Sequence, residues 1–464
     1  MKKKVISVLL TMAMVASLTA CGGGSNGGDS AADSGEAATE NAPADAGSDA
    51  APADDGAAVT EGASADDNTL TVWTWDPNFN VYAINKAAEI YAKDHEGFKV
   101  EVSEVQSDDI ETRITTAVSA GDLSTLPDIL LMQDNSFQKY VINYPDVYTD
   151  LTSSGIDFSQ FSSAKVAYST IDGKNYGIPF DNGTVINCVR TDILEQAGFT
   201  VDDFTDVTWS DYMEKAKVVL EKTGVPMLTA QAGSPDQVMM MLQSCGSSLF
   251  NADGTVNIDG NAELKEIMNI YVQMVKDGTL VEVTDWDQYI ASLNNGTAAS
   301  AMNGCWIMAS ITPVEDQSGK WALTNMPKLD TISGATNYSN NGGSSWAITS
   351  NCQKVDLAVD FMNSTFAGST ELYDDVISKG ALATWAPAGE SEAYAQPVDC
   401  FGGDAIYAKI VEYATQTPSN ITGAYYYDAR DAVGVALSNV CQQGADIDAE
   451  IKTAQETVEF NMGG

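Results

Sequence analysis

The sequence predicts an α/β protein built from two successive regions. Between residues 69 and 132, strand-like and helix-like segments alternate in the order β-α-β-α-β, which is typical of doubly wound sheets. A second series of strands and helices begins at residue 182. The chain has 464 residues, of which 44% are apolar. This is more than one hydrophobic core usually supports, so we expect two domains.

The first region contains three predicted strands and two predicted helices. The strands are residues 69–75, 98–105 and 128–132, and the helices are residues 82–93 and 110–120. The first helix places Ile84, Ala87 and Tyr91 on one face. The last strand, DILLM, is apolar after its first residue, as expected for a strand in a parallel sheet that is covered on both faces.

The second region is longer and less regular. Strands are predicted at residues 182–190, 297–306 and 344–350, and helices from residue 208 and at 263–277, 356–366, 405–415 and 428–440. The helix that follows Thr208 has an N-cap signature at Ser210. Residues 250–258 predict a hairpin around Asp253-Gly254. A calcium loop there would need a glutamate where Ala262 stands, so we favour the hairpin.

The first 20 residues have the features of a lipoprotein signal peptide. Three lysines precede an apolar stretch that is shorter than a membrane span, and LTAC at 18–21 resembles a bacterial lipobox. We therefore expect cleavage before Cys21 and lipid on that cysteine, which would tether the protein to a membrane. Cleavage removes three lysines and no acids, so the mature charge is −42 − 3 = −45.

Residues 21–68 predict a lipidated cysteine followed by a disordered acidic linker. Residues 22–68 contain no Lys, Arg or aromatic residue and consist largely of Gly, Ala, Ser, Asp and Glu. Such a segment cannot bury enough apolar surface to offset the entropy lost on ordering. A long acidic spacer suits the outer face of a cytoplasmic membrane in a Gram-positive-like cell better than a periplasm.

Charge and cysteine content exclude several classes of function. A chain of net charge −42 has no basic stripe to bind nucleic acid. The six cysteines beyond Cys21 include no C-x-x-C pair, which argues against a zinc or thioredoxin-type site, and we expect mostly buried thiols. The single histidine, His95, lies in a polar helix end and does not indicate catalysis. We expect no metal and no cofactor.

Several segments in order resemble the family 1 extracellular solute-binding proteins, the carbohydrate-binding components of bacterial ABC importers related to maltose-binding protein. They are TLTVWTWDPNF from residue 69, RITTAVSAGDLSTLPDILLMQD at 113–134, YGIPFDNGTVINCVRTDILEQAG at 176–198, NNGTAASAMNGCWIMASI at 294–311 and GSSWAITSNCQKVDLAVDFMNSTFAG at 343–368. The resemblance runs from about residue 69 to the C-terminus. No single motif is decisive, but their order and spacing are.

This resemblance implies a two-lobed, periplasmic-binding-protein-like fold of type II with a hinge cleft. It implies an N-terminal lobe of residues 69–181 plus 346–383 and a C-terminal lobe of residues 182–345 plus 384–464. The lobes would close over a carbohydrate, as in other hinge-closing receptors, and membrane permease subunits would read the closed form. It further implies a protein that is not an enzyme, and we expect a monomer.

A sugar site needs aromatic faces for the C–H groups of the rings, and carboxylates or amides for the hydroxyls. Trp75, Asp76 and Asn78 follow the first strand, whereas Trp73 is expected in the core. The resemblance implies that Trp306 stacks on a sugar ring. The remaining candidates are Gln133, Asp134 and Asn135 after the DILLM strand, Asp181, Asn182, Trp346 and Trp385 at the chain crossings, and Tyr426 in the run of three tyrosines, with Asp236 and Gln237 as weaker candidates.

Two other functions stay open at this point. A polyamine or peptide receptor of the same architecture could also use tryptophans and carboxylates, by cation–π contact in the polyamine case. A cleft dominated by acids would favour a polyamine, and a mixture of amides and acids would favour a sugar. An anchored glycoside hydrolase would need two carboxylates at a defined separation, and the sequence identifies no such pair.

Overall fold

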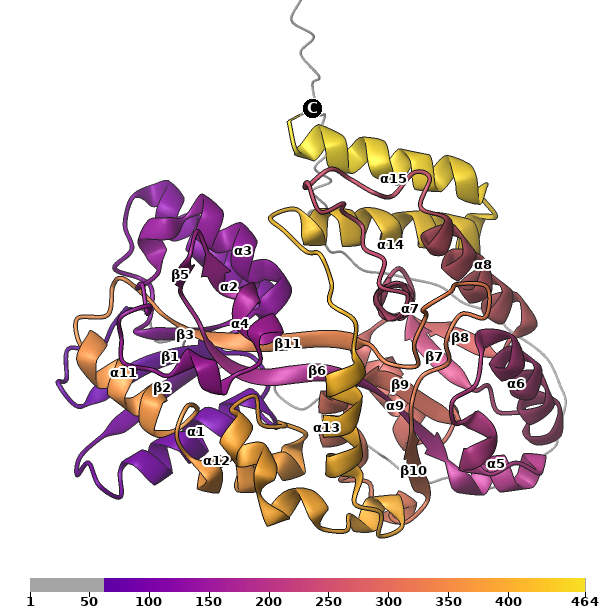
Figure 1. Cartoon of the computed structure of the whole chain (residues 1–464), viewed down its shortest axis with the longest axis horizontal. Helices are drawn as coiled ribbons and strands as arrows, with labels where there is room; N and C mark the ends of the chain where they lie inside the picture. The colour runs from indigo at the N-terminus through magenta and orange to yellow at the C-terminus, as the bar shows by residue number, and fades with distance from the viewer. Residues whose placement is uncertain (1–61, 464) are drawn as a thin grey trace, which may run out of the picture. The chain divides into compact units, whose positions relative to one another are not determined.

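The computed structural model describes residues 62–463, which belong to a single compact unit (Figure 1). The predicted signal peptide, Cys21 and most of the predicted spacer lie outside these residues. Two groups of helices flank a mixed sheet, and we call the parts of the molecule that they cover the first and the second lobe.

A seven-stranded sheet runs through both lobes. Its strand order is β10-β6-β11-β3-β1-β2, and β9 pairs with β6 off this path. The strands are β1 (Thr69–Thr74), β2 (Lys99–Glu104), β3 (Ile129–Gln133), β6 (Ile178–Arg190), β9 (Ser300–Gly304), β10 (Trp321–Thr324) and β11 (Asn340–Ile348). β1 is parallel to β2 and β3, whereas β11 is antiparallel to β3 and β6. Two small sheets pair β4 (Thr170–Ile171) with β5 (Lys174–Asn175) and β7 (Leu228–Gln231) with β8 (Leu280–Val283).

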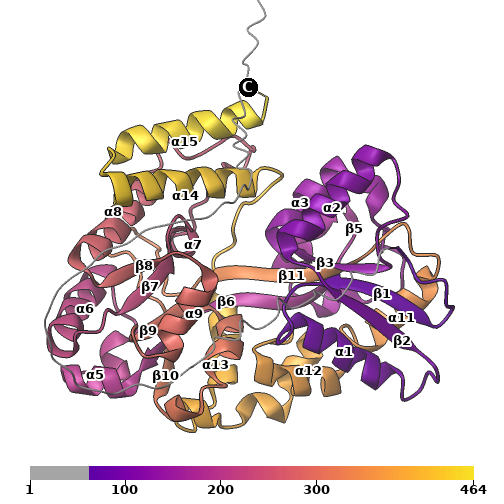
Figure 2. The ribbon, with the colours of Figure 1, turned by 180° about the vertical axis from the view of Figure 1, so that it is seen from behind.

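The strands β6 and β11 connect the two lobes and run side by side between them (Figures 1 and 2). The first part of β6 pairs with β11, for example Asn182 with Gly343. Its second part pairs with β9 and β10 of the second lobe, for example Val185 with Gly304. Because one continuous strand belongs to both lobes, the floor between them is built from strand pairing, although its register shifts between Asn340 and Gly343 and between Ser344 and Ser345.

Helices cover both faces of the sheet in the first lobe. They are α1 (Asn80–Tyr91), α2 (Ser107–Ala120), α3 (Asp134–Asn143), α4 (Ser163–Tyr168), α11 (Val355–Ser364) and α12 (Thr370–Val376). Every residue of β1 is buried, and its side chains alternate between the faces: Leu70 and Val72 pack with α1, α11 and α12, and Trp73 packs with α2 and α3. Burial on both faces accounts for the apolar run at β3.

The second lobe contains the remaining helices. They are α5 (Thr191–Ala197), α6 (Trp209–Thr223), α7 (Asp236–Ser244), α8 (Ala262–Asp277), α9 (Trp286–Asn294), α10 (Met308–Ile311), α13 (Ile406–Gln416), α14 (Tyr426–Gln443) and α15 (Ile447–Asn461). The C-terminal pair α14 and α15 packs on α8 through Ala429, Leu437 and Val458, in the same core as α6 and α7. A second core lies between β6, α9 and α13.

The alternating elements predicted for residues 69–132 are confirmed, and no end is shifted by more than three residues. The predicted N-cap at Ser210 is wrong: Thr208 caps α6, and its side chain accepts a hydrogen bond from the Asp211 amide at 3.2 Å. The predicted hairpin at 250–258 is a turn closed by a single antiparallel bridge between Phe250 and Val256. The pattern did not predict α3, α7, α9 or α15 as helices.

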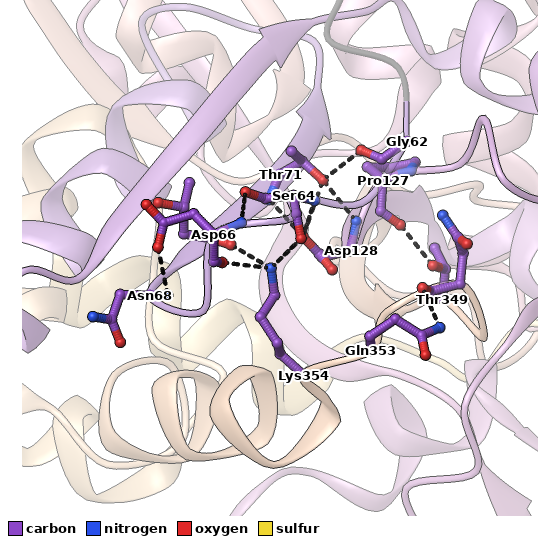
Figure 3. Close-up of polar contacts among 12 residues, drawn as sticks. Gly62, Ser64, Asp66, Asn68, Thr71, Pro127, Asp128, Thr349, Gln353 and Lys354 are labelled. Carbon is purple, nitrogen blue, oxygen red and sulfur yellow. Dashed lines mark hydrogen bonds and ion pairs between the residues drawn. The ribbon is translucent and has the colours of Figure 1, made fainter.

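Residues 62–68, which composition assigns to the spacer, are fixed to the first lobe (Figure 3). The Lys354 ammonium donates to the carbonyls of Ser64, Asp66 and Thr69 at 2.7, 3.0 and 2.7 Å. The buried Asp128 carboxylate accepts from the backbone amides of Ser64 at 3.2 Å and Thr71 at 2.9 Å. The folded domain therefore begins before Thr69, and its first turn depends on side chains that are distant in sequence.

Among residues 62–463, no helix has both the length and the hydropathy that crossing a bilayer requires. Over the same residues, no group of three or more His, Cys, Asp or Glu side chains is placed to hold a metal ion. The six cysteines in this range are free thiols, and four of them are buried: Cys188, Cys305, Cys352 and Cys400. The expectation of mostly buried thiols is confirmed.

Candidate functional site

A cavity of about 1350 Å³ lies between the lobes, above the paired strands β6 and β11. Its first-lobe wall consists of the turns after β1 and β2 together with α2 and α3. Its second-lobe wall consists of the first turns of α7 and α14, one side of α9 along its whole length, and Trp306. The cavity exceeds the roughly 300–1,000 Å³ that holds a drug-sized ligand, so it has room for a ligand of more than one ring.

The turn between β1 and α1 is organised by Asn80, which also lines the cavity. Its side-chain oxygen accepts from the Thr74 hydroxyl at 2.6 Å and from the amides of Trp75 and Asp76 at 3.2 and 2.9 Å. The Asp76 carboxylate in turn accepts from the Asn78 amide at 2.8 Å. These local bonds fix the backbone and hold the Trp75 side chain at the cavity wall.

The second-lobe wall carries two tryptophan rings, Trp286 and Trp306, and the buried Tyr289 packs behind Trp286. Trp286 stacks on Tyr289, with centroids 5.0 Å apart and planes 21° apart, and lies 5.8 Å from Trp306 at 45°. The Trp306 indole N–H donates to the Asn341 carbonyl at 2.9 Å, and the Tyr289 hydroxyl accepts from the Asn303 amide at 3.3 Å. The polar atoms of Trp306 and Tyr289 are thus bonded within the protein. Trp286 remains 39% exposed at the cavity wall.

A buried ion pair lies beneath the cavity floor. The Lys165 ammonium donates to the Asp134 carboxylate and, at 2.8 Å, to the Ser344 carbonyl of β11. The other Asp134 oxygen accepts from the Ser345 hydroxyl at 3.0 Å. Both charged side chains are only 3% exposed. This network ties α3 and α4 to the strand that crosses between the lobes.

Asp181 of β6 extends this network up to the cavity. Its carboxylate accepts from the Ser344 hydroxyl and lines the cavity floor. Burial raises the pKa of Asp181, while Lys165 and Ser344 act in the opposite direction. The close packing here requires a glycine at position 343: its φ is +103°, and an added Cβ would lie 2.6 Å from an Asp134 oxygen.

The Asp134 carboxyl gives the stability of the protein a specific pH dependence. Burial raises its pKa from 3.8 to about 6, although Lys165 opposes the shift. Because the folded-state pKa lies above the unfolded one, the stabilisation is fully present below pH 3.8 and is lost as the pH rises through about 6. Lowering the pH from 7 to 5 should therefore raise the free energy of unfolding by about 1 kcal/mol through this group.

The measurement is urea unfolding of the natural chain and of Asp134→Asn at pH 7 and pH 5. The asparagine does not titrate, so the difference in unfolding free energy between the two proteins should grow at pH 5. An equal difference at both values would contradict the raised pKa of Asp134.

The charged groups that line the cavity are mostly acidic. The carboxylates are Asp76, Glu104, Asp108, Glu111, Asp181, Asp236, Asp287, Asp428 and Asp431. The cations in the lining are Lys139 and Arg430, and each is paired with a carboxylate: Lys139 with Asp428 at 3.1 Å, and Arg430 with Asp236. Amide side chains are interspersed at Asn78, Asn80, Gln106, Gln133, Asn135, Asn294 and Asn341. A ligand would meet hydrogen-bond acceptors and amides rather than a cationic surface.

The structure brings most of the sequence-predicted site residues to this cavity. Those that line it are Trp75, Asp76, Asn78, Gln133, Asn135, Asp181, Trp306 and Tyr426, and the weaker candidate Asp236. Four candidates do not line it: Asp134, Asn182, Trp346 and Trp385. The weaker candidate Gln237 is also outside the lining and donates to the Met302 sulfur at 3.4 Å.

The four candidates outside the lining make contacts within the protein instead. Asp134 is the buried partner of Lys165. Trp346 is fully buried in the first-lobe core, 5.5 Å from Phe180. Trp385 is half-buried and packs on the same core. The carbonyl of Asn182 accepts from the Cys305 thiol at 3.2 Å, beneath the floor. A position at a chain crossing therefore did not suffice to place a side chain in the cavity.

Sequence reasoning missed three lining residues that shape the site: Trp286, Lys139 and Arg430. Tyr427, which also lines the cavity, belongs to the run of three tyrosines from which Tyr426 was chosen. Trp286 had a usable signal, because an aromatic residue between Asp285 and Asp287 repeats the pattern of Trp75-Asp76. The two cations carried no local signal, since their pairing with acids of distant elements appears only in the folded chain.

Comparisons with known proteins agree with this architecture. A family model of bacterial extracellular solute-binding proteins matches residues 86–396. A lactose-binding protein of Rhizobium radiobacter is 36% identical over 388 residues, covering 83% of this chain and 91% of that protein. The chain belongs to the bacterial extracellular solute-binding proteins. These proteins bind solutes rather than transform them, so the chain is not an enzyme.

Two more distant proteins also match this chain, one by sequence and one by fold. An arabinooligosaccharide-binding protein of Halalkalibacterium halodurans is 23% identical over 412 residues, covering 84% of this chain and 85% of that protein. An ABC transporter associated binding protein of B. animalis subsp. lactis, solved with β-1,6-galactobiose, has a TM-score of 0.71 at 22% identity and covers 84% of this chain and 96% of its own. This extracellular solute-binding protein therefore has the two-lobed, periplasmic-binding-protein-like fold.

Proposed function

We propose that this protein captures a short carbohydrate in the cavity between its lobes and delivers it to the permease subunits of an ABC importer. The observation that carries the proposal is the pair of tryptophans, Trp286 and Trp306, that line one cavity together with acids and amides. Ring faces suit the C–H surface of a sugar, and carboxylates and amides suit its hydroxyls. The lactose-binding relative, at 36% identity, supports a sugar ligand.

We assign ligand contacts to the lining residues of both walls. Trp306 and Trp286 would stack on sugar rings from the second lobe, and Trp75 would face them from the first. The amides of Gln133 and Asn135 and the carboxylate of Asp181 would bond hydroxyl groups. Lipid on Cys21 would hold the protein at the outer face of the cytoplasmic membrane, which the lipobox at 18–21 supports.

A polyamine is the second candidate, because carboxylates outnumber cations in the lining and both cations are paired. The interspersed amides favour the sugar, since an ammonium ligand has no acceptor for their N–H groups. Thermal shift and calorimetry with lactose, β-1,6-galactobiose, an arabino-oligosaccharide, putrescine and a tripeptide would separate the two. Binding of putrescine and of no sugar would overturn the carbohydrate proposal.

Trp306→Ala should weaken binding of the sugar that the screen identifies by about thirtyfold, the loss typical of a buried aromatic anchor. Phe460→Ala is the matched control, because this aromatic residue is 78% exposed and does not line the cavity. We expect unchanged affinity in the control. Equal affinity of Trp306→Ala and the natural chain would show that Trp306 does not contact the ligand.

A further inference from the structure

Side chains in the first turn of α14 contact α3 and β3 of the opposite lobe. Figures 1 and 2 show α14 on the second lobe, with α3 on the other side of the molecule. The Lys139 ammonium of α3 lies 3.1 Å from the Asp428 carboxylate of α14. The Tyr427 hydroxyl of α14 donates to the side-chain oxygen of Gln133, the last residue of β3. Both contacts join elements of different lobes, although 289 and 294 residues separate the partners.

Each partner is held by its own lobe. On the second-lobe side, Asp428 also accepts from Asn461 of α15 at 3.4 Å, and the Arg430 guanidinium lies 5.6 Å from the centre of the Tyr427 ring. Arg430 is itself bonded to Asp236 of α7. The packing of α14 on this lobe is tight: a Cβ at Gly434 would lie 2.5 Å from the Gly233 carbonyl.

On the first-lobe side, Gln133 is paired with Ser344 at the end of the sheet, and α3 is tied to β11 by the buried pair of Asp134 and Lys165. The side chains of Gln133 and Lys139 therefore cannot follow α14 if the lobes separate. The contacts of Lys139 with Asp428 and of Gln133 with Tyr427 therefore form only when the two lobes are close together.

We propose that Lys139 and Asp428, assisted by Gln133 and Tyr427, form an inter-lobe latch. These are positioning residues: they raise the population of the closed arrangement before ligand arrives and so set the apparent affinity of the cavity. A ligand that needs both walls binds in proportion to the fraction of protein in the competent arrangement. The effect on affinity rests on the proposed function, whereas the effect on the lobes does not.

The size of the effect follows from the exposure of the pair. The side chains of Lys139 and Asp428 are 36% and 23% exposed, so water and salt partly screen the attraction. Loss of such a pair typically changes an equilibrium by about twofold to fivefold. We expect this factor in the closed-to-open ratio of the ligand-free protein. The dissociation constant should rise by up to the same factor, and by the whole of it when the closed arrangement is the minor one.

The first measurement is the inter-lobe distance distribution in the full chain without ligand. Spin labels would be placed through introduced azido amino acids at Glu101 of β2 and Glu214 of α6, which are exposed and lie in different lobes. Labelling this way leaves the native thiols untouched. We expect Lys139→Met and Asp428→Asn to shift the distribution toward separated lobes, and high salt to shift the natural chain in the same direction.

Two further variants make the test specific. The charge exchange Lys139→Asp with Asp428→Lys should restore the natural distribution, because it rebuilds the pair with reversed polarity. Lys265→Met is the matched control: it removes a lysine whose partner, Asp448 at 2.5 Å, lies on α15 of the same lobe. We expect no shift in this control.

The outcomes separate the latch from the ligand site. An unchanged distance distribution in Lys139→Met and Asp428→Asn would overturn the latch, even if sugar affinity fell, because the residues would then act by touching the ligand. A shifted distribution, together with a dissociation constant raised as the measured loss of closed protein requires, would support it. If no sugar bound, the proposed function would fail, and the ligand-free distances would still decide on the latch.

Discussion

Lys165→Met is expected to lower the free energy of unfolding by about 3–5 kcal/mol, the usual loss when one partner of a buried ion pair is removed. Lys165 is the cation bonded to Asp134, and it also lowers the pKa of Asp181 against the effect of burial. Without it, two carboxyls remain in a water-poor floor with no opposing charge. Urea unfolding at pH 7 measures the loss.

The control for this prediction is Lys93→Met. Its ion pair with Glu371 has side chains that are 56% and 60% exposed, so the loss should be below about 1 kcal/mol. The double variant Lys165→Met with Asp134→Asn should recover part of the lost stability, because the asparagine oxygen can still accept from Ser345. A single-variant loss as small as that of Lys93→Met would show that the Asp134–Lys165 pair is not a structural support.

Gly183→Ala is expected to lower the free energy of unfolding by about 3 kcal/mol and to weaken ligand binding with it. At this point β6 and β11 approach so closely that an added Cβ would lie 2.0 Å from the Asn341 carbonyl oxygen. The strands would have to separate, and Asn341 accepts the hydrogen bond that orients the Trp306 indole. Chemical unfolding and calorimetric titration measure the two effects.

Gly389→Ala is the matched control for the same substitution. A Cβ at this position has no atom within 4 Å, and the backbone is outside the left-handed region. The change in unfolding free energy should stay within about 0.5 kcal/mol, as for other surface substitutions. If the two alanine variants were equally stable, the strands at the crossing would have to be able to move apart at little cost.

The sequence allowed the fold class and the regular part of the first lobe to be predicted, because helix and strand periodicities there are strong. The all-apolar strand β3 and the helix α2 are examples. Helix α7 was missed because its apolar residues form one short run, VMMML, which periodicity alone cannot tell from a buried strand. Residues 62–68 were assigned to the spacer because their order depends on Asp128 and Lys354, which no local composition can indicate.

Prediction of the site was most successful where a candidate lay in a turn at the end of a strand. Trp75, Asp76 and Gln133 follow strands whose ends meet at one edge of the sheet, and all three line the cavity. It was least successful at the crossings, where alternation along a strand decides which way a side chain points. Asp181 faces the cavity, whereas Trp346, on the neighbouring strand, is fully buried in the core.

The attachment of residues 62–68 to the first lobe also decides where a mechanical load would enter the domain. Tension applied to the chain before Gly62 would reach Asp128 and Lys354 first. From there it would pass into the paired strands β1 and β3 of the seven-stranded sheet. It would not act across the cavity, because these anchors lie in one lobe. With the chain held before Gly62, the first lobe would be the stationary half, and a load on the second lobe would reach it through β6 and β11.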